Sequence, residues 1–139
     1  MATVIRPKIS VKNKYWIDKH RHYELKHFCL QYPEWKKAYN TQLAIVPSSS
    51  ILESSTSRGQ TSDNTATLAI KRAHYAQKIN LIERIAREAD ETLHTYILKA
   101  VTEGLSFPYL QSQLNIPCGK DMYYDRYRKF FWLLSEARN

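Results

Sequence analysis

The hydrophobic pattern is clearest in the second half of the chain, where apolar residues recur at helical spacing. One stripe advances in steps of four and three, which places its members on one side of a long helix. The stripe comprises Tyr75, Ile79, Ile82, Ala86 and Ala89. It predicts a helix that packs against neighbours along a single face.

Short polar residues and a glycine mark where this helix and the next begin and end. Ser62 or Asp63 is placed to cap the long helix, because a short side-chain oxygen accepts hydrogen bonds from the free N–H groups of a first turn. Asp90 breaks the stripe and is placed to cap a following helix, which Gly104 ends. The apolar face of that helix comprises Leu93, Ile97, Ala100 and Val101.

Two further helices are predicted at residues 106–114 and 119–137, joined by a tight corner at Asn115-Ile116-Pro117. Ile116 is expected to plug the corner. The buried face of the last helix is expected to comprise Tyr123, Tyr127, Phe130, Phe131 and Leu134. Its opposite side carries Lys120, Asp121, Tyr124, Asp125, Arg128 and Trp132, with Arg126 and Lys129 beside it.

The first half of the chain has a weaker pattern. Trp16, Tyr23 and Leu30 repeat every seven residues, and Tyr32-Pro33 interrupts that helix before a second piece from Glu34. Next comes a stretch rich in serine and threonine, with no period that could bury a face. We interpret it as a linker or loop.

These elements predict an all-α protein: a helical array with a C-terminal helix-turn-helix and an N-terminal helical segment. Only three glycines and five prolines occur in 139 residues. We divide the chain into a basic N-terminal helical segment (1–45), a Ser/Thr-rich linker or loop (46–62) and a helical helix-turn-helix DNA-binding domain (63–139).

Charge points to a polyanionic partner. The chain has 21 lysines and arginines against 13 aspartates and glutamates, a net charge of +8, which favours such a partner without naming it. The alternative is a basic protein with no such partner.

The last helix has two different faces, as a recognition helix does. One is an apolar stripe that packs on the protein, and the other carries cations that can reach phosphates and base edges in a major groove. The candidate DNA contacts are Lys120, Tyr124, Arg126, Arg128 and Lys129. Asp121 and Asp125 count against this hypothesis, because carboxylates repel phosphates. The alternative is an amphipathic C-terminal helix with a solvated basic side.

Other chemistry has little support in the sequence. His20, His22, His27 and Cys29 do not converge on one face of a helix, so we expect no metal site. No motif of a hydrolase or zinc protease is present, so we expect neither catalysis nor a cofactor. Cys29 and Cys118 form no CxxC pair and no segment resembles a signal peptide or membrane span, which favours a reduced, cytoplasmic protein that does not contact membranes.

The stretch "LSFPYLQSQLNIPCGKDMYYDRYRKFFWLLSEAR", preceded by "TSDNTATLAIKRAHYAQKINLIERIAREADETLHTYILKAVTEG", resembles the RinA- and ArpU-type transcriptional regulators of phages and prophages of Gram-positive bacteria. The C-terminal part of these regulators is similar to region 4 of sigma-70 factors. The resemblance covers residues 61–138. It implies binding to double-stranded DNA near promoters in a bacterial host cell, activation of late phage genes and contact with host RNA polymerase.

Two alternatives from other classes stay open. A small terminase subunit for DNA packaging also combines a helix-turn-helix with helical oligomerisation segments, and predicts a ring-sized assembly where a regulator predicts a monomer or homodimer. A protein-interaction module would use the basic helix to bind an acidic protein. The N-terminal helix, with Lys12, Lys14, Lys19, Arg21 and Lys26, is either a second phosphate-contacting surface or a packed helix with a wet basic side.

Overall fold

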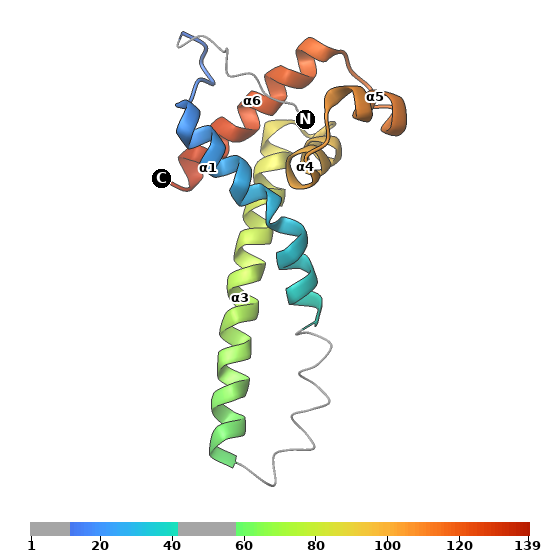
Figure 1. The fold of residues 1–139 in the computed structure, drawn as a ribbon. Helices are drawn as coiled ribbons and strands as arrows, with labels where there is room; N and C mark the ends of the chain where they lie inside the picture. The colour runs from blue at the N-terminus through green and yellow to red at the C-terminus, as the bar shows by residue number, and fades with distance from the viewer. Residues whose placement is uncertain (1–11, 42–57) are drawn as a thin grey trace. The chain divides into compact units, whose positions relative to one another are not determined.

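The computed structural model describes residues 12–41 and 58–139, and all regular secondary structure in these ranges is α-helical (Figure 1). The all-α prediction is therefore confirmed. The predicted linker lies mostly outside the described residues, as does the start of the basic N-terminal segment. The helices are α1 (Lys19–Leu30), α3 (Arg58–Ala89), α4 (His94–Glu103), α5 (Phe107–Leu114) and α6 (Lys120–Ala137), and residues 32–41 are also helical.

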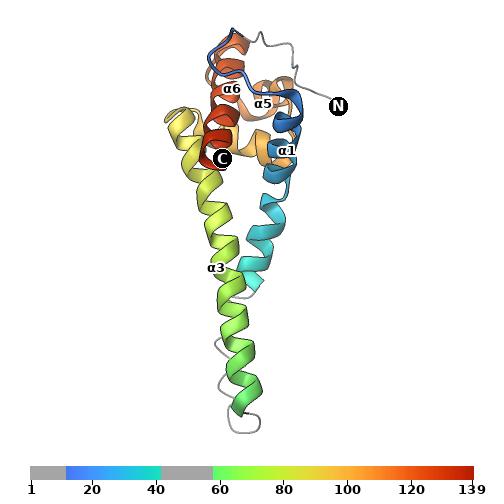
Figure 2. The same cartoon turned by 90° about the vertical axis from the view of Figure 1, so that its left-hand side faces the viewer.

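The chain divides into two compact units. The first combines Met1–Gln31 with Ile82–Asn139, and the second is Tyr32–Leu81. In the first unit α1 contacts α4 and α6, and α4 also contacts α5 and α6 (Figure 2). One apolar core lies among these elements: Leu25, Phe28, Cys29, Ile82, Ile85, Ala86, Ala89, Leu93, Ile97, Ala100, Val101, Phe107, Leu110, Ile116, Tyr123, Phe130, Phe131 and Leu134.

This division differs from the predicted boundaries, which separated residues 1–45 from a domain at 63–139. The reason is the apolar stripe of α1, in which Leu25, Phe28 and Cys29 are all buried. Burying such a stripe is favourable, and α4 and α6 provide the cover. The N-terminal helix therefore completes the core of the C-terminal helices.

The buried stripe of α1 also differs from the predicted seven-residue repeat. The side chain of Asp18 accepts a hydrogen bond from the backbone N–H of His20 at 3.0 Å and caps the helix, so Trp16 precedes α1. Trp16 and Tyr23 are 37% and 42% exposed. A repeat of three members is short, and here it did not identify the packed face.

The long helix α3 begins at Arg58, four residues before the predicted cap at Ser62 or Asp63. The capping signal was ambiguous because serine and threonine occur throughout the preceding segment, and each offers the same oxygen. The predicted linker therefore extends into α3 over its last five residues.

The predicted end of α3 before Asp90 and the end of α4 at Gly104 are confirmed. The Oδ1 of Asp90 accepts hydrogen bonds from the backbone N–H groups of Thr92 and Leu93, both at 2.8 Å, and so fixes the turn that precedes α4. The N-cap residue of α4 is Leu93, not the predicted Asp90. Gly104 ends α4 in the left-handed region (φ 71°), and its N–H donates to the carbonyl of Ala100 at 2.9 Å. A side chain at this φ would be strained, which explains the glycine.

In the second unit, the helix of residues 32–41 follows the break at Gln31, which confirms the predicted interruption at Tyr32-Pro33. Trp35 on this helix is buried, and the Lys78 ammonium of α3 lies 5.1 Å from the centre of its ring. Such cation–π contacts add to the packing of the two helices.

Candidate nucleic-acid interface

The pair α5 and α6 is joined by a short corner whose backbone is fixed by hydrogen bonds. Ser106 caps α5 by accepting from the N–H of Tyr109 at 3.3 Å. Asn115 ends α5 in the left-handed region (φ 52°), a conformation that asparagine tolerates better than most residues. The N–H of Ile116 then donates to the carbonyl of Leu110 at 3.1 Å.

Ile116 anchors this corner in the core. It is buried, as predicted, and so is Leu110 of α5. The residues on either side of Ile116, Asn115 and Pro117, are exposed. The corner therefore exposes these two residues to solvent while the side chain of Ile116 holds it in place.

The first turn of α6 is open to solvent. Gly119 is the N-cap residue, has no side chain with which to accept a hydrogen bond, and would meet no atom within 4 Å if it carried a Cβ. Lys120, Asp121 and Met122 are exposed. Because the first N–H groups of a helix have no intrahelical acceptor, this turn offers hydrogen-bond donors and a partial positive charge to an anion.

The opposite face of α6 is packed, which confirms its predicted orientation. Tyr123, Phe130, Phe131 and Leu134 are buried, and Tyr127 is half-buried. The aromatic rings contact one another and their neighbours. Ring centres are 5.3 Å apart for Phe107 and Tyr123, 5.0 Å for Tyr127 and Phe131, and 4.7 Å for His22 and Phe131.

The two predicted DNA contacts nearest the start of α6, Lys120 and Tyr124, differ in how far the protein itself holds them in place. Lys120 is exposed at the start of α6 and makes no ion pair with any described residue. Tyr124, one turn later, is half-buried, with its ring 5.1 Å from that of Tyr123 and 6.3 Å from that of Phe107. Tyr124 is therefore positioned by the aromatic core, whereas Lys120 is free to reach a ligand.

Arg126 has a structural partner. Its Nε donates to the Oδ2 of Asp90 at 2.9 Å, and its Nη1 also bonds to Asp125. Burial acts to raise the pKa of Asp90, but hydrogen bonds from Leu93, Arg126 and Thr92 outweigh it and hold this pKa below its ordinary value. Arg126 therefore ties α6 to the junction of α3 and α4, a role that the sequence did not reveal because the partners are 36 residues apart.

Arg128 and Lys129 have no such partners. Both side chains are half-buried. The Nε of Arg128 is buried and has no hydrogen-bond partner in the described part of the chain. A buried donor without a partner is costly. Because this nitrogen is buried, an anion that approaches Arg128 from solvent would pair with the charge of the guanidinium and not with Nε.

The positive charge of the protein is concentrated away from α6. Residues 82–139 carry eight lysines and arginines and eight aspartates and glutamates, whereas residues 1–31 carry seven and two. Residues 82–139 therefore have no net charge of their own. Counting the charges segment by segment shows this uneven distribution from the sequence alone, whereas the total net charge of +8 hides it.

The residues that invited a metal hypothesis are separated in the structure. Cys29 is buried in the core, where burial raises the pKa of its thiol. His22 packs on Phe131, while His20 and His27 are exposed. Residues 12–41 and 58–139 contain no cluster of three histidine, cysteine, aspartate or glutamate side chains that could hold a metal ion.

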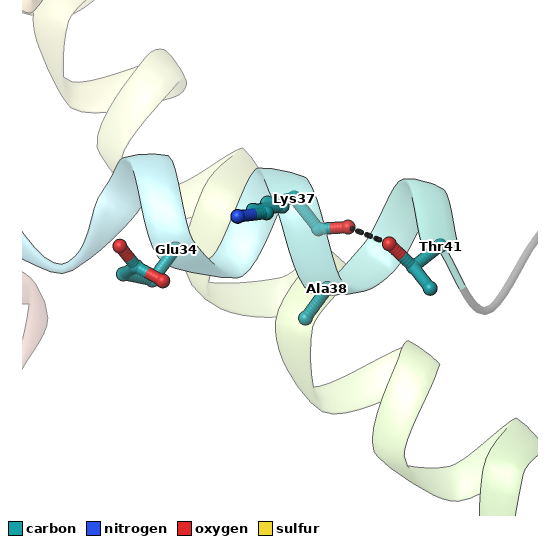
Figure 3. Close-up of a pocket in the computed structure, with 4 residues that line it drawn as sticks. All are labelled: Glu34, Lys37, Ala38 and Thr41. Carbon is teal, nitrogen blue, oxygen red and sulfur yellow. Dashed lines mark hydrogen bonds between the residues drawn. The ribbon is translucent and has the colours of Figure 1, made fainter.

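A shallow hollow of about 320 Å³ lies along the helix of residues 32–41 (Figure 3). Glu34, Lys37, Ala38 and Thr41 line it. The hydroxyl of Thr41 donates to the carbonyl of Lys37 at 2.8 Å, and the two charged side chains have opposite signs. The two charges that line the hollow therefore cancel, so it has no net charge with which to select an anion.

Among the helices that the structure describes, none is both long enough and apolar enough to cross a membrane. The two cysteines are both free thiols. No protein-family model, curated protein or solved structure matches this chain.

Proposed function

We propose that this protein is a sequence-specific, DNA-binding transcriptional regulator that contacts double-stranded DNA with α6, the second helix of a helix-turn-helix formed by α5 and α6. The resemblance described above implies the same function. It further implies activation of late phage genes. In this proposal α6 enters the major groove, and α5 with the corner sets its angle.

The observation that carries the proposal is the state of the cations on α6. Lys120, Arg128 and Lys129 make no ion pair within the described residues. Arg126, by contrast, is paired with Asp90. The charges of the three unpaired cations are therefore available to phosphates, which pair well with guanidinium and ammonium groups.

The open first turn of α6 supports the same proposal. Its free N–H groups and the exposed Lys120 lie next to the exposed corner residues Asn115 and Pro117. Backbone N–H groups at helix starts and lysines are common donors to DNA phosphates and base edges. The exposed Asp121 is compatible with this, because an acid in the first turn also stabilises the helix dipole.

The test is the salt dependence of binding to a fluorescently labelled duplex of mixed sequence, measured by anisotropy. Each phosphate contact that is lost lowers the slope of log Kobs against log salt by about one unit. We expect Arg128→Ala to show this loss on every duplex. The double variant Arg128→Ala/Lys129→Ala should lose about two units.

A matched control separates contact from net charge. Lys99 on α4 is an exposed cation that pairs with Glu103 at 3.3 Å, so Lys99→Ala removes the same charge as Arg128→Ala. We expect the control to keep the slope of the parent. If the double variant stays folded and binds every duplex as the parent does, these cations do not contact DNA and α6 is not the DNA-contacting helix. A parent chain that binds no duplex would favour the interaction-module alternative.

Sequence preference is tested separately. After genomic footprinting has identified a preferred site, Lys120→Ala should cost about 1–3 kcal/mol on that site and little on a scrambled duplex, because a base contact is lost. An equal loss of binding free energy on both duplexes would instead show that Lys120 contacts a phosphate.

A further inference from the structure

The N-terminal part of the first unit, residues 1–31, holds cations that the proposed helix-turn-helix does not use. Residues 1–31 carry seven of the basic residues and only two acidic ones. Both acids have partners inside the protein. Asp18 accepts from the backbone of His20 as a helix cap, and Glu24 pairs with Arg21 at 2.9 Å.

Two exposed lysines of this region have no carboxylate partner among the described residues. Lys14 and Lys19 are both exposed, and neither has an ion pair among the residues that the structure describes. Each lies near a tyrosine ring instead, at 5.1 Å from the ring of Tyr15 and 6.0 Å from the ring of Tyr23. A cation–π contact restrains a lysine without cancelling its charge.

These lysines belong to a segment that is fixed against α6. The ring centre of Tyr15 lies 6.0 Å from that of Trp132. Arg21 donates from Nε to the hydroxyl of Ser135 and from Nη2 to the carbonyl of Ser135, each at 3.0 Å. Figure 2 shows residues 12–18 passing beside α6 before α1 begins.

The anchoring determines what these lysines contribute to binding. A cation on a tethered but mobile segment must be ordered when it binds, which costs conformational entropy. Here Tyr15 and Arg21 connect the segment to α6 before any ligand arrives. This segment therefore supplies, in the same unit, the positive charge that residues 82–139 lack.

We propose that Lys14 and Lys19 form a second phosphate-contacting surface, held against the C-terminal half of α6 by Tyr15 and Arg21, for the same DNA duplex that α6 binds. This inference rests on the proposed function. Because lysines that contact phosphates carry no sequence information, this surface contributes affinity for all sequences alike.

The experiment measures, by anisotropy at several salt concentrations, the binding of four double variants of the full chain to a preferred and a scrambled duplex. Three are alanine pairs, and the fourth is the charge-conserving Lys14→Arg/Lys19→Arg. The first is Lys14→Ala/Lys19→Ala. The second is the α6 variant Arg128→Ala/Lys129→Ala. The third, Lys37→Ala/Lys71→Ala, is a control with equal charge loss from exposed lysines of the second unit. Circular dichroism confirms that each variant keeps its helix content.

We expect Lys14→Ala/Lys19→Ala to lower the salt slope by about two units on preferred and scrambled duplexes equally, and Lys14→Arg/Lys19→Arg to keep the parental slope. An unchanged slope in the first variant, with a lowered slope in the α6 variant, overturns this inference alone. An equal drop in the control also overturns it, because net charge then explains the effect. Absence of DNA binding by the parent chain overturns the proposed function itself.

Discussion

At the scale of single residues, the structure assigns different tasks to side chains that look alike in sequence. Arg126 and Arg128 stand two positions apart on α6, yet one has two carboxylate partners and the other has none. The helical rotation between them turns Arg126 towards Asp90. Arg126 is therefore a positioning residue, and Arg128 remains the stronger candidate for a phosphate contact.

This difference predicts opposite outcomes for two alanine variants. Arg126→Ala leaves Asp90 without its charged partner and should lower the free energy of unfolding by about 1–3 kcal/mol, the usual range for a hydrogen bond to a charged group. Arg128→Ala should leave stability nearly unchanged and weaken DNA binding. Thermal unfolding and anisotropy of the two variants check this, and a stable Arg126→Ala variant with weak binding would reverse the assignment.

His22 predicts a dependence of stability on pH. It packs against Phe131 and Tyr127, and burial, with the nearby charge of Lys26, lowers its pKa from 6.5 to about 4. The unfolded chain therefore binds a proton more readily than the folded chain. Stability should be lost as pH falls from about 6.5 to 4, by at most about 3 kcal/mol from this group.

The measurement is the melting temperature of the parent and of His22→Phe between pH 7 and pH 4. The Phe variant keeps an aromatic ring against Phe131 but has no proton to bind, so its melting temperature should fall less. His27→Phe, at an exposed position, should behave as the parent does. Equal pH profiles for all three proteins would show that His22 is not buried as described.

At the scale of elements, α6 depends on its buried aromatic face. Phe130 is fully buried, and its helix, α6, contacts α1 and α4. Phe130→Ala should cost about 3–5 kcal/mol and unfold a domain of ordinary stability. Met122→Ala on the exposed side of the same helix is the control and should change stability by less than about 0.5 kcal/mol. Similar melting temperatures for both variants would contradict the orientation of α6.

The elements also show what the sequence could and could not predict. Asp90 and the left-handed Gly104 stand directly after the helices that they end, so local pattern was enough to predict these ends. The packing of α1 on α4 and α6 was not predictable, because it depends on contacts between helices that are far apart in the sequence. The same holds for the candidate site. The spacing of the apolar residues predicted which side of α6 is buried, but it could not predict the pairing of Arg126 with Asp90.

At the scale of the whole molecule, the mass in solution distinguishes the proposed regulator from a DNA-packaging subunit. One chain has a mass of 16.4 kDa. We expect light scattering to give the mass of one chain or of a dimer, because a regulator needs no larger assembly. A ring-sized mass would favour the small-terminase alternative, in which a helix-turn-helix is repeated around a closed ring.

The central claim is that DNA binds along α6, and amide hydrogen exchange of the full chain with and without a duplex tests it most directly. The first N–H groups of α6 lack intrahelical acceptors, and Gly119 provides no side-chain cap, so these amides should exchange quickly in the free protein. We predict that a bound duplex slows exchange in residues 119–122 at low salt, and that the protection disappears as salt rises. Bound DNA that leaves the start of α6 unprotected, while protecting another part of the chain, would contradict the claim.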